Sequence, residues 1–273
     1  MITASLVLFK SNPEEVNRVL SCAEKSNISI VYVIDNSPTD ELRELVTKAT
    51  AKADYIFGQG NVGYGEGNNI GIRKSIEAGS LYHAILNPDI IFNADSIDNL
   101  FEFMESHSEV GCVKPALTHV DGSFNASALS LPTPYITFGR RLFPSKYTER
   151  INSYFELKDC NLNVTREVPN MSGSFLFVRT NVFKRIGMFD TRYFMYFEDF
   201  DLVRRIHLVS KIVYYPKVSI VHAHRAEHKF NKKLFLISIK SAIKYFNKWG
   251  WLLDKDRTRW NKEARMPISI IDC

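Results

Sequence analysis

The sequence predicts an α/β fold in which helices cover both faces of a mostly parallel sheet. Up to about residue 115, short β-rich runs alternate with helical stretches, which is the pattern of a parallel sheet with crossover helices. The chain has 273 residues, of which 45% are hydrophobic and 24% charged. It can therefore bury a sizeable core, in one large domain or in one domain with an appendage.

The first strand is expected at 2–9, and the helix after it near Pro13, whose missing N–H suits a first helical turn. The elements that follow are a strand at 28–34, a helix from about Thr39, a strand at 55–57, a glycine-rich loop at 58–67, a helix to about Ala78 and a strand at 82–86. Sheets of this kind bind ligands at the carboxyl ends of their strands. The segments that follow the second, third and fourth strands are therefore the candidate site.

The second half of the chain is less regular at first. Residues 110–169 are interpreted as an insertion or flexible loop with a hairpin turn at Asp121-Gly122. Order is expected to resume at Asn170, with a strand at 174–178, a short helix ending at Gly187, a helix at 199–208 and strands at 211–215 and 218–221.

Composition excludes several classes of protein. The uncharged segment 124–139 contains two prolines and is too polar to span a membrane. The N-terminus has no basic start before its apolar run, so it is interpreted as a strand rather than a signal peptide, and a cytoplasmic protein is expected. The four cysteines lie far apart, which argues against a zinc site; they are Cys22, Cys112, Cys160 and Cys273.

Charge is concentrated near the C-terminus. Residues 225–265 hold 12 basic and 4 acidic residues, whereas the rest of the chain is slightly acidic. We therefore expect a domain at 1–224 and a basic, aromatic helical extension at 225–273 that meets an anionic partner, either nucleic acid or anionic lipid. No recognised nucleic-acid motif accompanies the extension, so lipid is favoured.

A helix in this extension has an apolar stripe. Phe235, Ile239, Ala242, Phe246 and Trp249 share one helical face, with lysines on the other. The stripe fits either a helix docked on the body or a helix at a membrane surface. In the membrane interpretation, four aromatic side chains lie at the lipid interface; they are Tyr245, Trp249, Trp251 and Trp260.

The glycine-rich loop departs from the dinucleotide fingerprint. Gly63 and Gly65 fit the G-x-G-x-x-G spacing, but Asn68 replaces the third glycine and the loop follows the third strand instead of the first. It is either a flexible turn that begins a helix, or a loop whose backbone N–H groups contact the phosphates of a nucleotide.

Acidic residues and histidines mark three further places. Asp89 ends Asn87-Pro88-Asp89 after a buried strand, as a turn cap or as a ligand of Mg²⁺ or Mn²⁺. Asp199 lies between Phe197 and Phe200 in an acidic segment that fits the first turn of a helix, or a general base of raised pKa. His222-Ala223-His224 ends a strand, and two histidines on one face can pack or bind a metal.

Together these segments resemble the family 2 inverting glycosyltransferases of the GT-A fold, over residues 5–224. Leu86-Asn87-Pro88-Asp89-Ile90, Ser172-Gly173-Ser174-Phe175-Leu176 and the segment from Phe194 to Leu202 are similar to the bacterial rhamnosyltransferase branch that builds lipid-linked O-antigen or capsule repeats.

The resemblance assigns roles to residues. It implies that Asp35 contacts the nucleotide base, that Asp199 is the catalytic base of a Glu-Asp pair, and that Asp89 is the metal-binding end of a D-x-D motif whose first Asp is Asn87 here. His222 lies where many members place a metal or diphosphate ligand. The other implied residues are Asn61, Gly63, Tyr64, Gly65 and Asn68 at the nucleotide sugar, and Ser172, Gly173 and Glu198 in the acceptor and donor pocket.

The resemblance also implies a reaction. A sugar, L-rhamnose from dTDP-rhamnose in this branch, passes from a nucleotide-sugar donor to a polyprenyl-linked glycan in one inverting step, with Mg²⁺ or Mn²⁺ as cofactor. The enzyme is expected to be peripheral on the inner face of the membrane. Alternatives are a galactosyl or glucosyl donor, a sugar nucleotidyltransferase, or a non-catalytic nucleotide-sugar-binding module.

Overall fold

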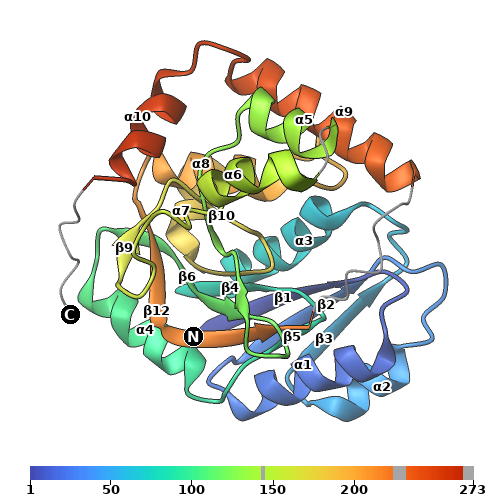
Figure 1. Cartoon of the computed structure of the whole chain (residues 1–273). Helices are drawn as coiled ribbons and strands as arrows, with labels where there is room; N and C mark the ends of the chain where they lie inside the picture. The colour runs from blue at the N-terminus through green and yellow to red at the C-terminus, as the bar shows by residue number, and fades with distance from the viewer. Residues whose placement is uncertain (143–144, 224–231, 267–273) are drawn as a thin grey trace.

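The computed structural model describes residues 1–142, 145–223 and 232–266. A twisted mixed sheet crosses the molecule, with helices on both faces (Figure 1). Its strands lie in the order β3-β2-β1-β4-β11-β6-β12-β5. The predicted α/β class and the mostly parallel first half are confirmed.

The first half of the sheet is parallel throughout. Its strands are β1 (Ile2–Leu8), β2 (Ile30–Asp35), β3 (Ala53–Phe57) and β4 (Tyr82–Leu86). The connecting helices are α1 (Pro13–Lys25), α2 (Arg43–Ala49) and α3 (Tyr64–Glu77). The side chain of Asn12 caps α1 by accepting the backbone N–H of Glu14 at 2.8 Å. The loop predicted at 58–67 is shorter than expected, because α3 already begins at Tyr64.

In the second half of the sheet, one prediction from the sequence is wrong. The region interpreted as an insertion holds β6 (Val110–Thr118), a nine-residue strand in the middle of the sheet. β11 (Phe175–Arg179) runs antiparallel to both β4 and β6, and β6 runs parallel to β12 (Lys211–His222). The two strands predicted at 211–221 are this single strand, with a register shift between Tyr215 and Ser219 around Pro216.

Short strands complete the sheet and its edges. β5 (Ile90–Ile91) and β9 (Arg166–Glu167) pair with β12, and β7 (Phe124–Asn125) pairs with β6 across the predicted turn at Gly122, where φ is +80°. β8 (Ala128–Leu129) and β10 (Asn170–Met171) form a separate two-stranded ladder.

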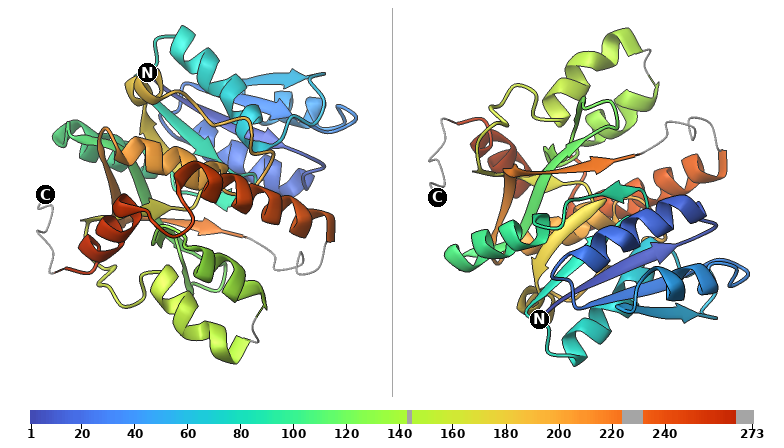
Figure 2. Two further views of the ribbon diagram at one scale, coloured as in Figure 1. Left: turned by 90° about the horizontal axis from the view of Figure 1, so that it is seen from above. Right: turned by 90° about the horizontal axis from the view of Figure 1, so that it is seen from below.

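The remaining helices divide between the two faces. Those described are α4 (Ser96–Ser106), α5 (Pro134–Leu142), α6 (Ser145–Phe155), α7 (Thr180–Ile186), α8 (Glu198–His207), α9 (Lys232–Trp249) and α10 (Lys255–Glu263). One core joins α1, α2 and α4 to the sheet, and a second joins α3, α7 and α8 to the other face. Figure 2 shows α5 and α6 as a projecting pair, and α9 running along the second face.

The C-terminal helices pack against this second face. Tyr245 and Phe246 are buried with Phe197, and Trp260 stacks on His207 with ring centroids 4.0 Å apart. The expectation that Tyr245 and Trp260 lie at a membrane interface is therefore wrong. Within the described residues, no helix is long and apolar enough to cross a membrane. The domain division at residue 225 stays a prediction.

A buried ion pair fixes the turn between α9 and α10. Asp254 caps α10 and accepts two hydrogen bonds from Arg204 of α8, each at 2.7 Å, and both side chains are almost fully buried. A bidentate pair of this kind has a defined geometry, so it ties the two helices together.

Candidate active site

Asp35 lies at the carboxyl end of β2, where the sequence predicted a ligand-binding side chain. Its carboxylate accepts the backbone N–H of Ser37 at 2.9 Å and the hydroxyl of Tyr55 at 2.6 Å. Burial and this hydrogen bond raise the pKa of Tyr55, so the phenol remains a donor. These contacts orient Asp35 at the sheet edge; its contact with a nucleotide base stays a prediction.

The loop after β3 packs against the segment that precedes α8. Gly63 has φ +87°, and a Cβ there would lie 2.3 Å from the carbonyl oxygen of Phe194, so only glycine fits. The Gly63 N–H donates to Asn61 Oδ1 at 3.2 Å, and the Tyr64 N–H donates to the same Phe194 oxygen at 3.1 Å. A Cβ on Gly65 would be 3.1 Å from Phe189. The glycines therefore allow a close approach of two backbone segments.

Asn68, which was predicted at the nucleotide sugar, forms hydrogen bonds within the protein. Its side chain is fully buried, accepts the hydroxyl of Ser5 at 2.6 Å and donates to the carbonyl of Tyr64 at 3.0 Å. Both polar ends are satisfied inside the protein. This geometry gives no support to a nucleotide contact by Asn68 and explains the residue as a link between β1 and the start of α3.

The Tyr64 hydroxyl joins three of the predicted segments. It lies 2.9 Å from Asn87 Oδ1 and 3.0 Å from the carbonyl oxygen of Gly173. The backbone N–H of Asn87 also donates to the carbonyl of Ser174 at 3.0 Å. The loops after β3 and β4 and the loop before β11 therefore meet at one point.

Asp89 and His222 come together although 132 residues separate them. Antiparallel pairing of β5 with β12 sets His222 opposite Ile90, and the Asp89 Oδ2 to His222 Nε2 distance is 3.1 Å. A carboxylate oxygen and an imidazole nitrogen can both bind a divalent cation that takes its other ligands from phosphates and water. His224 lies outside the described residues, and within them no cluster of three or more such side chains occurs.

Asp199 is held at the start of α8 by backbone amides. Its two oxygens accept the N–H of Gly173 at 2.8 Å and of Phe200 at 2.9 Å. Burial raises the pKa of the Asp199 carboxyl, while the two amides and the charge of Lys114 act in the opposite direction. A Cβ on Gly173 would lie 2.7 Å from Asp199 Cβ, so this contact requires glycine.

Glu198 is buried beside Asp199. In the described part of the chain its Oε2 has no hydrogen-bond partner, and burial together with the charge of Asp199 raises its pKa well above the usual value. The two residues before it, Tyr196 and Phe197, have φ of +68° and +67°. Consecutive left-handed residues without glycine are strained, and this bend presents both carboxyl groups at the helix start.

The two carboxyl groups line a pocket of about 380 Å³. Aromatic rings and one arginine form most of its remaining wall; the lining residues are Pro132, Ile136, Thr137, Arg140, Phe155, Tyr196, Phe197, Glu198, Asp199 and Phe200. Ser172 and Gly173, which were predicted in the acceptor and donor pocket, are not among these lining residues; the Ser172 N–H donates to the carbonyl of Ser127 at 3.2 Å. The predicted acidic and aromatic residues therefore form one cavity.

Sequence reasoning missed Lys114. This lysine of β6 is fully buried, and its Nζ donates to the carbonyl oxygens of Ser172 at 2.7 Å and Phe175 at 2.9 Å, with Ser174 Oγ at 3.3 Å. Burial lowers its pKa to about 7. It fixes the loop whose Gly173 amide binds Asp199. Nothing in the sequence indicated a buried lysine here, and its strand was interpreted as part of an insertion.

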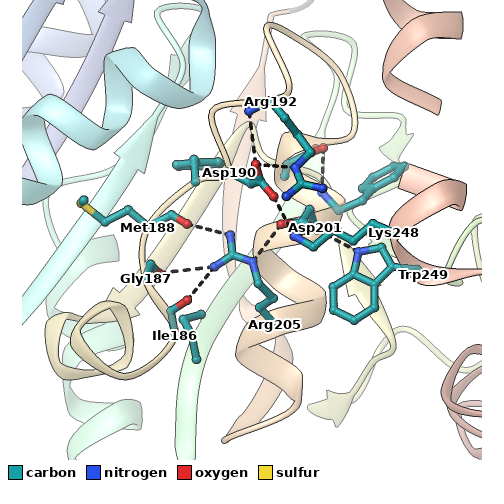
Figure 3. Close-up of polar contacts among 12 residues, drawn as sticks. Ile186, Gly187, Met188, Asp190, Arg192, Asp201, Arg205, Lys248 and Trp249 are labelled. Carbon is teal, nitrogen blue, oxygen red and sulfur yellow. Dashed lines mark hydrogen bonds and ion pairs between the residues drawn. The ribbon is translucent and has the colours of Figure 1, made fainter. Parts of the chain in front are cut away.

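The first turn of α8 is joined to α9 (Figure 3). The fully buried Asp201 accepts Arg205 Nε and Trp249 Nε1, both at 2.8 Å, and pairs with Lys248 at 2.6 Å. Arg205 also donates to the backbone carbonyls that precede the pocket segment, including that of Met188 at 2.7 Å. Contacts with α9 and with the backbone of residues 186–188 therefore fix the first turn of α8.

Comparison with known proteins identifies the family. The family model described as glycosyl transferase family 2 matches residues 13–187, which include the loops after β2, β3 and β4 and the Gly173 loop. The chain belongs to glycosyl transferase family 2. The predicted family is confirmed, and so is its reaction class, the transfer of a glycosyl group.

Its relatives include two rhamnosyltransferases. One is the N-acetylglucosaminyl-diphospho-decaprenol L-rhamnosyltransferase of Mycobacterium tuberculosis, 30% identical over 76% of this chain and 70% of the relative. The other is the rhamnosyltransferase WbbL of Escherichia coli K12, 31% identical over 79% of this chain and 81% of the relative. The family 2 chain thus matches both over most of their length.

A solved structure supports the fold. GalNAc-T7 with UDP, GalNAc and Mn²⁺ superposes with a TM-score of 0.65 over 91% of this chain, at 14% sequence identity. The family 2 chain spans 48% of that protein's length. A likeness at this identity concerns the fold, and it agrees with the predicted GT-A architecture.

Proposed function

We propose that this enzyme transfers L-rhamnose from dTDP-rhamnose to a polyprenyl-linked glycan with inversion at the anomeric carbon. The observation that carries the proposal is the pocket in which Asp199 and Glu198 lie side by side at the loop junction of Tyr64 and Gly173. The names of the two rhamnosyltransferase relatives support the sugar, and the mycobacterial name supports the lipid-linked acceptor. A galactosyl or glucosyl donor is the alternative.

Asp199 is the general base of this mechanism. An acceptor hydroxyl attacks the anomeric carbon as the bond from that carbon to the diphosphate oxygen breaks, and its proton passes to Asp199. A carboxylate whose pKa is raised by burial accepts this proton more readily than an ordinary aspartate. The Gly173 and Phe200 amides keep the carboxylate ionised and oriented.

Glu198 lies beside this base. Burial and the charge of Asp199 raise its pKa well above the usual value, which favours the protonated form of Glu198 while Asp199 is charged. That limits charge repulsion between the pair and a donor diphosphate. Glu198 is therefore part of the pocket without being the base.

The donor is proposed to lie along the strand ends. Asp35 would meet the base, and Asn61, Gly63, Tyr64 and Gly65 the phosphates and sugar, with Asn87 beside them. Asp89 and His222 are the residues that would hold Mg²⁺ or Mn²⁺, since their ligand atoms converge to 3.1 Å. Such a cation offsets the negative charge of a nucleoside diphosphate as it leaves.

The direct test compares two matched amide variants. Asp199→Asn should lower turnover roughly 10²- to 10⁴-fold, as expected for loss of a general base, with the Kd for the donor unchanged by calorimetry. Glu198→Gln, the control, mimics the protonated form of Glu198 and should retain turnover within a few fold. Full turnover of Asp199→Asn, or equal losses in both variants, would reject Asp199 as the base.

The metal proposal has its own test. Binding of Mn²⁺ to the free enzyme, measured by electron paramagnetic resonance, should be lost in Asp89→Ala and weakened in His222→Ala. Transfer should stop after exhaustive chelation and return with Mg²⁺ or Mn²⁺. Unchanged Mn²⁺ binding by Asp89→Ala would show that Asp89 only ends a turn.

We also propose that the enzyme works as a peripheral protein on the inner face of the membrane. Residues 228–253 contain no acidic side chain, and the exposed face of α9 presents Lys233, Lys240 and Lys244. After α9, Leu252 and Leu253 are 85% and 95% exposed. Exposed leucines next to a basic helix face suit the surface of an anionic bilayer.

Vesicle sedimentation tests this surface. Replacing Leu252 and Leu253 by serine should weaken binding to vesicles that contain anionic lipid, whereas Leu81→Ser, at an exposed leucine before β4, should not. Transfer to a soluble acceptor should be equal in all three proteins. Equal binding to anionic and neutral vesicles, or no effect of the double substitution, would contradict the proposal.

A further inference from the structure

The pocket at Asp199 has an uneven distribution of charge. Two acidic side chains, Glu198 and Asp199, lie in its wall, and Arg140 of α5 is the one cationic residue among those that line it in the described chain. Negative groups of a substrate can therefore approach only at the Arg140 side without meeting like charge. The remaining lining residues are uncharged.

Arg140 is oriented but still has donors to offer. Its guanidinium lies 4.8 Å from the ring centre of Phe155, and one nitrogen is 3.5 Å from Glu156 Oε1. Glu156 also pairs with Lys158 at the shorter distance of 2.8 Å. About a third of the Arg140 side chain is exposed. Arginine has five N–H donors, so one long contact leaves most of them available to a ligand.

Aromatic rings separate Arg140 from the catalytic base. The Phe155 ring below the guanidinium contacts the ring of Phe200, with centroids 6.1 Å apart, and Phe200 follows Asp199 in the chain. The arginine and the base therefore lie at different parts of one wall. A sugar can pack its C–H groups on these rings between them.

On its other side, α5 contacts the exposed apolar turn after α9. The Phe138 ring stacks on Trp251, with centroids 6.2 Å apart and planes 7° from parallel. Leu252 and Leu253 follow Trp251 and are largely exposed. Figure 1 shows α5 beside α9. The helix that presents Arg140 thus lies between the pocket and an apolar surface.

We propose that Arg140 binds the diphosphate that joins the acceptor sugar to its lipid. The acceptor then lies with its hydroxyl at Asp199, its diphosphate at Arg140 and its polyprenyl chain toward Trp251 and Leu252. A planar guanidinium donates two parallel hydrogen bonds to a phosphate, and its charge offsets the repulsion from the charged Asp199. This inference rests on the proposed function, from which it takes the lipid-linked acceptor.

The test compares two acceptors that share one sugar. One has the sugar on a short-chain polyprenyl diphosphate, and the other has it on a neutral alkyl glycoside. Arg140→Gln should raise KM for the diphosphate acceptor roughly 10- to 100-fold, as expected for loss of hydrogen bonds to a charged group. It should leave KM for the glycoside and the donor Kd unchanged. Arg140→Lys should recover part of the loss, since it restores the charge without the bidentate geometry.

Glu156→Gln is the matched control, because it removes the ion-pair partner of Arg140 and keeps the cation. It should leave both KM values unchanged. The proposal is overturned if Arg140→Gln affects the two acceptors equally, if it affects neither, or if Glu156→Gln reproduces its effect. Absence of transfer to either acceptor by the unmodified enzyme would instead contradict the proposed function.

Discussion

Replacing Lys114 with methionine should change how the stability of the protein depends on pH. Lys114 is fully buried, and burial lowers its pKa from 10.5 to about 7. Between these values the unfolded chain binds a proton at this site and the folded chain does not. The free energy of unfolding of the wild type therefore rises with pH in this range, because stability increases where the unfolded state binds more protons. Methionine has no proton to bind, so the variant lacks this contribution.

The size of the effect follows from the two pKa values. The burial penalty is fully present below pH 7 and disappears above pH 10.5. From pH 7.5 to pH 9.5, the wild type should gain about 2 to 3 kcal/mol of stability relative to Lys114→Met. Groups common to both proteins, such as the buried tyrosines, largely cancel in this difference.

Urea unfolding of both proteins at pH 7.5, 8.5 and 9.5 measures this difference, provided that the slopes with urea agree. Parallel pH dependences of the two proteins would refute the reasoning, since they would mean that Lys114 keeps an ordinary pKa. Turnover should also fall in the variant, because the Ser172 and Phe175 carbonyls lose their shared donor and the Gly173 amide is no longer fixed against Asp199.

Three further outcomes are expected. Asp254→Asn should lower the free energy of unfolding by about 3 to 5 kcal/mol in urea titrations, because it leaves the buried charge of Arg204 without a carboxylate; a loss under 1 kcal/mol would contradict this. Gly173→Ala should reduce kcat at least tenfold with donor affinity retained in calorimetry, since its Cβ would displace Asp199; normal turnover would show that the contact can relax. As pH falls, kcat should decrease at a higher pH than the usual pKa of an aspartate, because burial raises the pKa of Asp199; a flat kcat down to pH 4 would exclude this base.

Much of the fold could be predicted, because each strand in the first half is a short apolar run bounded by turn residues. Tyr82–Leu86 agrees with the prediction at both ends. β6 was missed for a physical reason: it contains Lys114 and Pro115, which a central strand normally excludes. Its lysine is tolerated only because carbonyl groups from the distant Ser172 loop accept its hydrogen bonds, and such a partner cannot be inferred from local sequence.

The candidate site could also be predicted only in part. The loops after the third and fourth strands were predicted to meet, because parallel strands share one carboxyl edge, and the hydrogen bond between Tyr64 and Asn87 confirms it. The Gly173 loop, which precedes the antiparallel β11 and also contacts Tyr64, was indicated only by the family resemblance. Asn68 was assigned to the ligand by its position in a motif, whereas its partner Ser5 lies on β1 inside the protein. Tyr245 was expected at a membrane surface but is buried. Helical periodicity shows which residues share a face, but it does not show how wide the buried face is.

The bonds of Asp201 have a consequence for chimeric enzymes. The first turn of α8 presents Glu198 and Asp199 to the pocket and Asp201 to Lys248 and Trp249 of α9. A swap of C-terminal segments between relatives to exchange acceptor preference would take Lys248 and Trp249 away from the buried Asp201 carboxylate, two residues after the base, and leave it paired with Arg205 of α8. Helices α8 and α9 should therefore be exchanged together. A crossover before α8 keeps the contacts of Asp201 with α9, whereas a crossover after α8 breaks them.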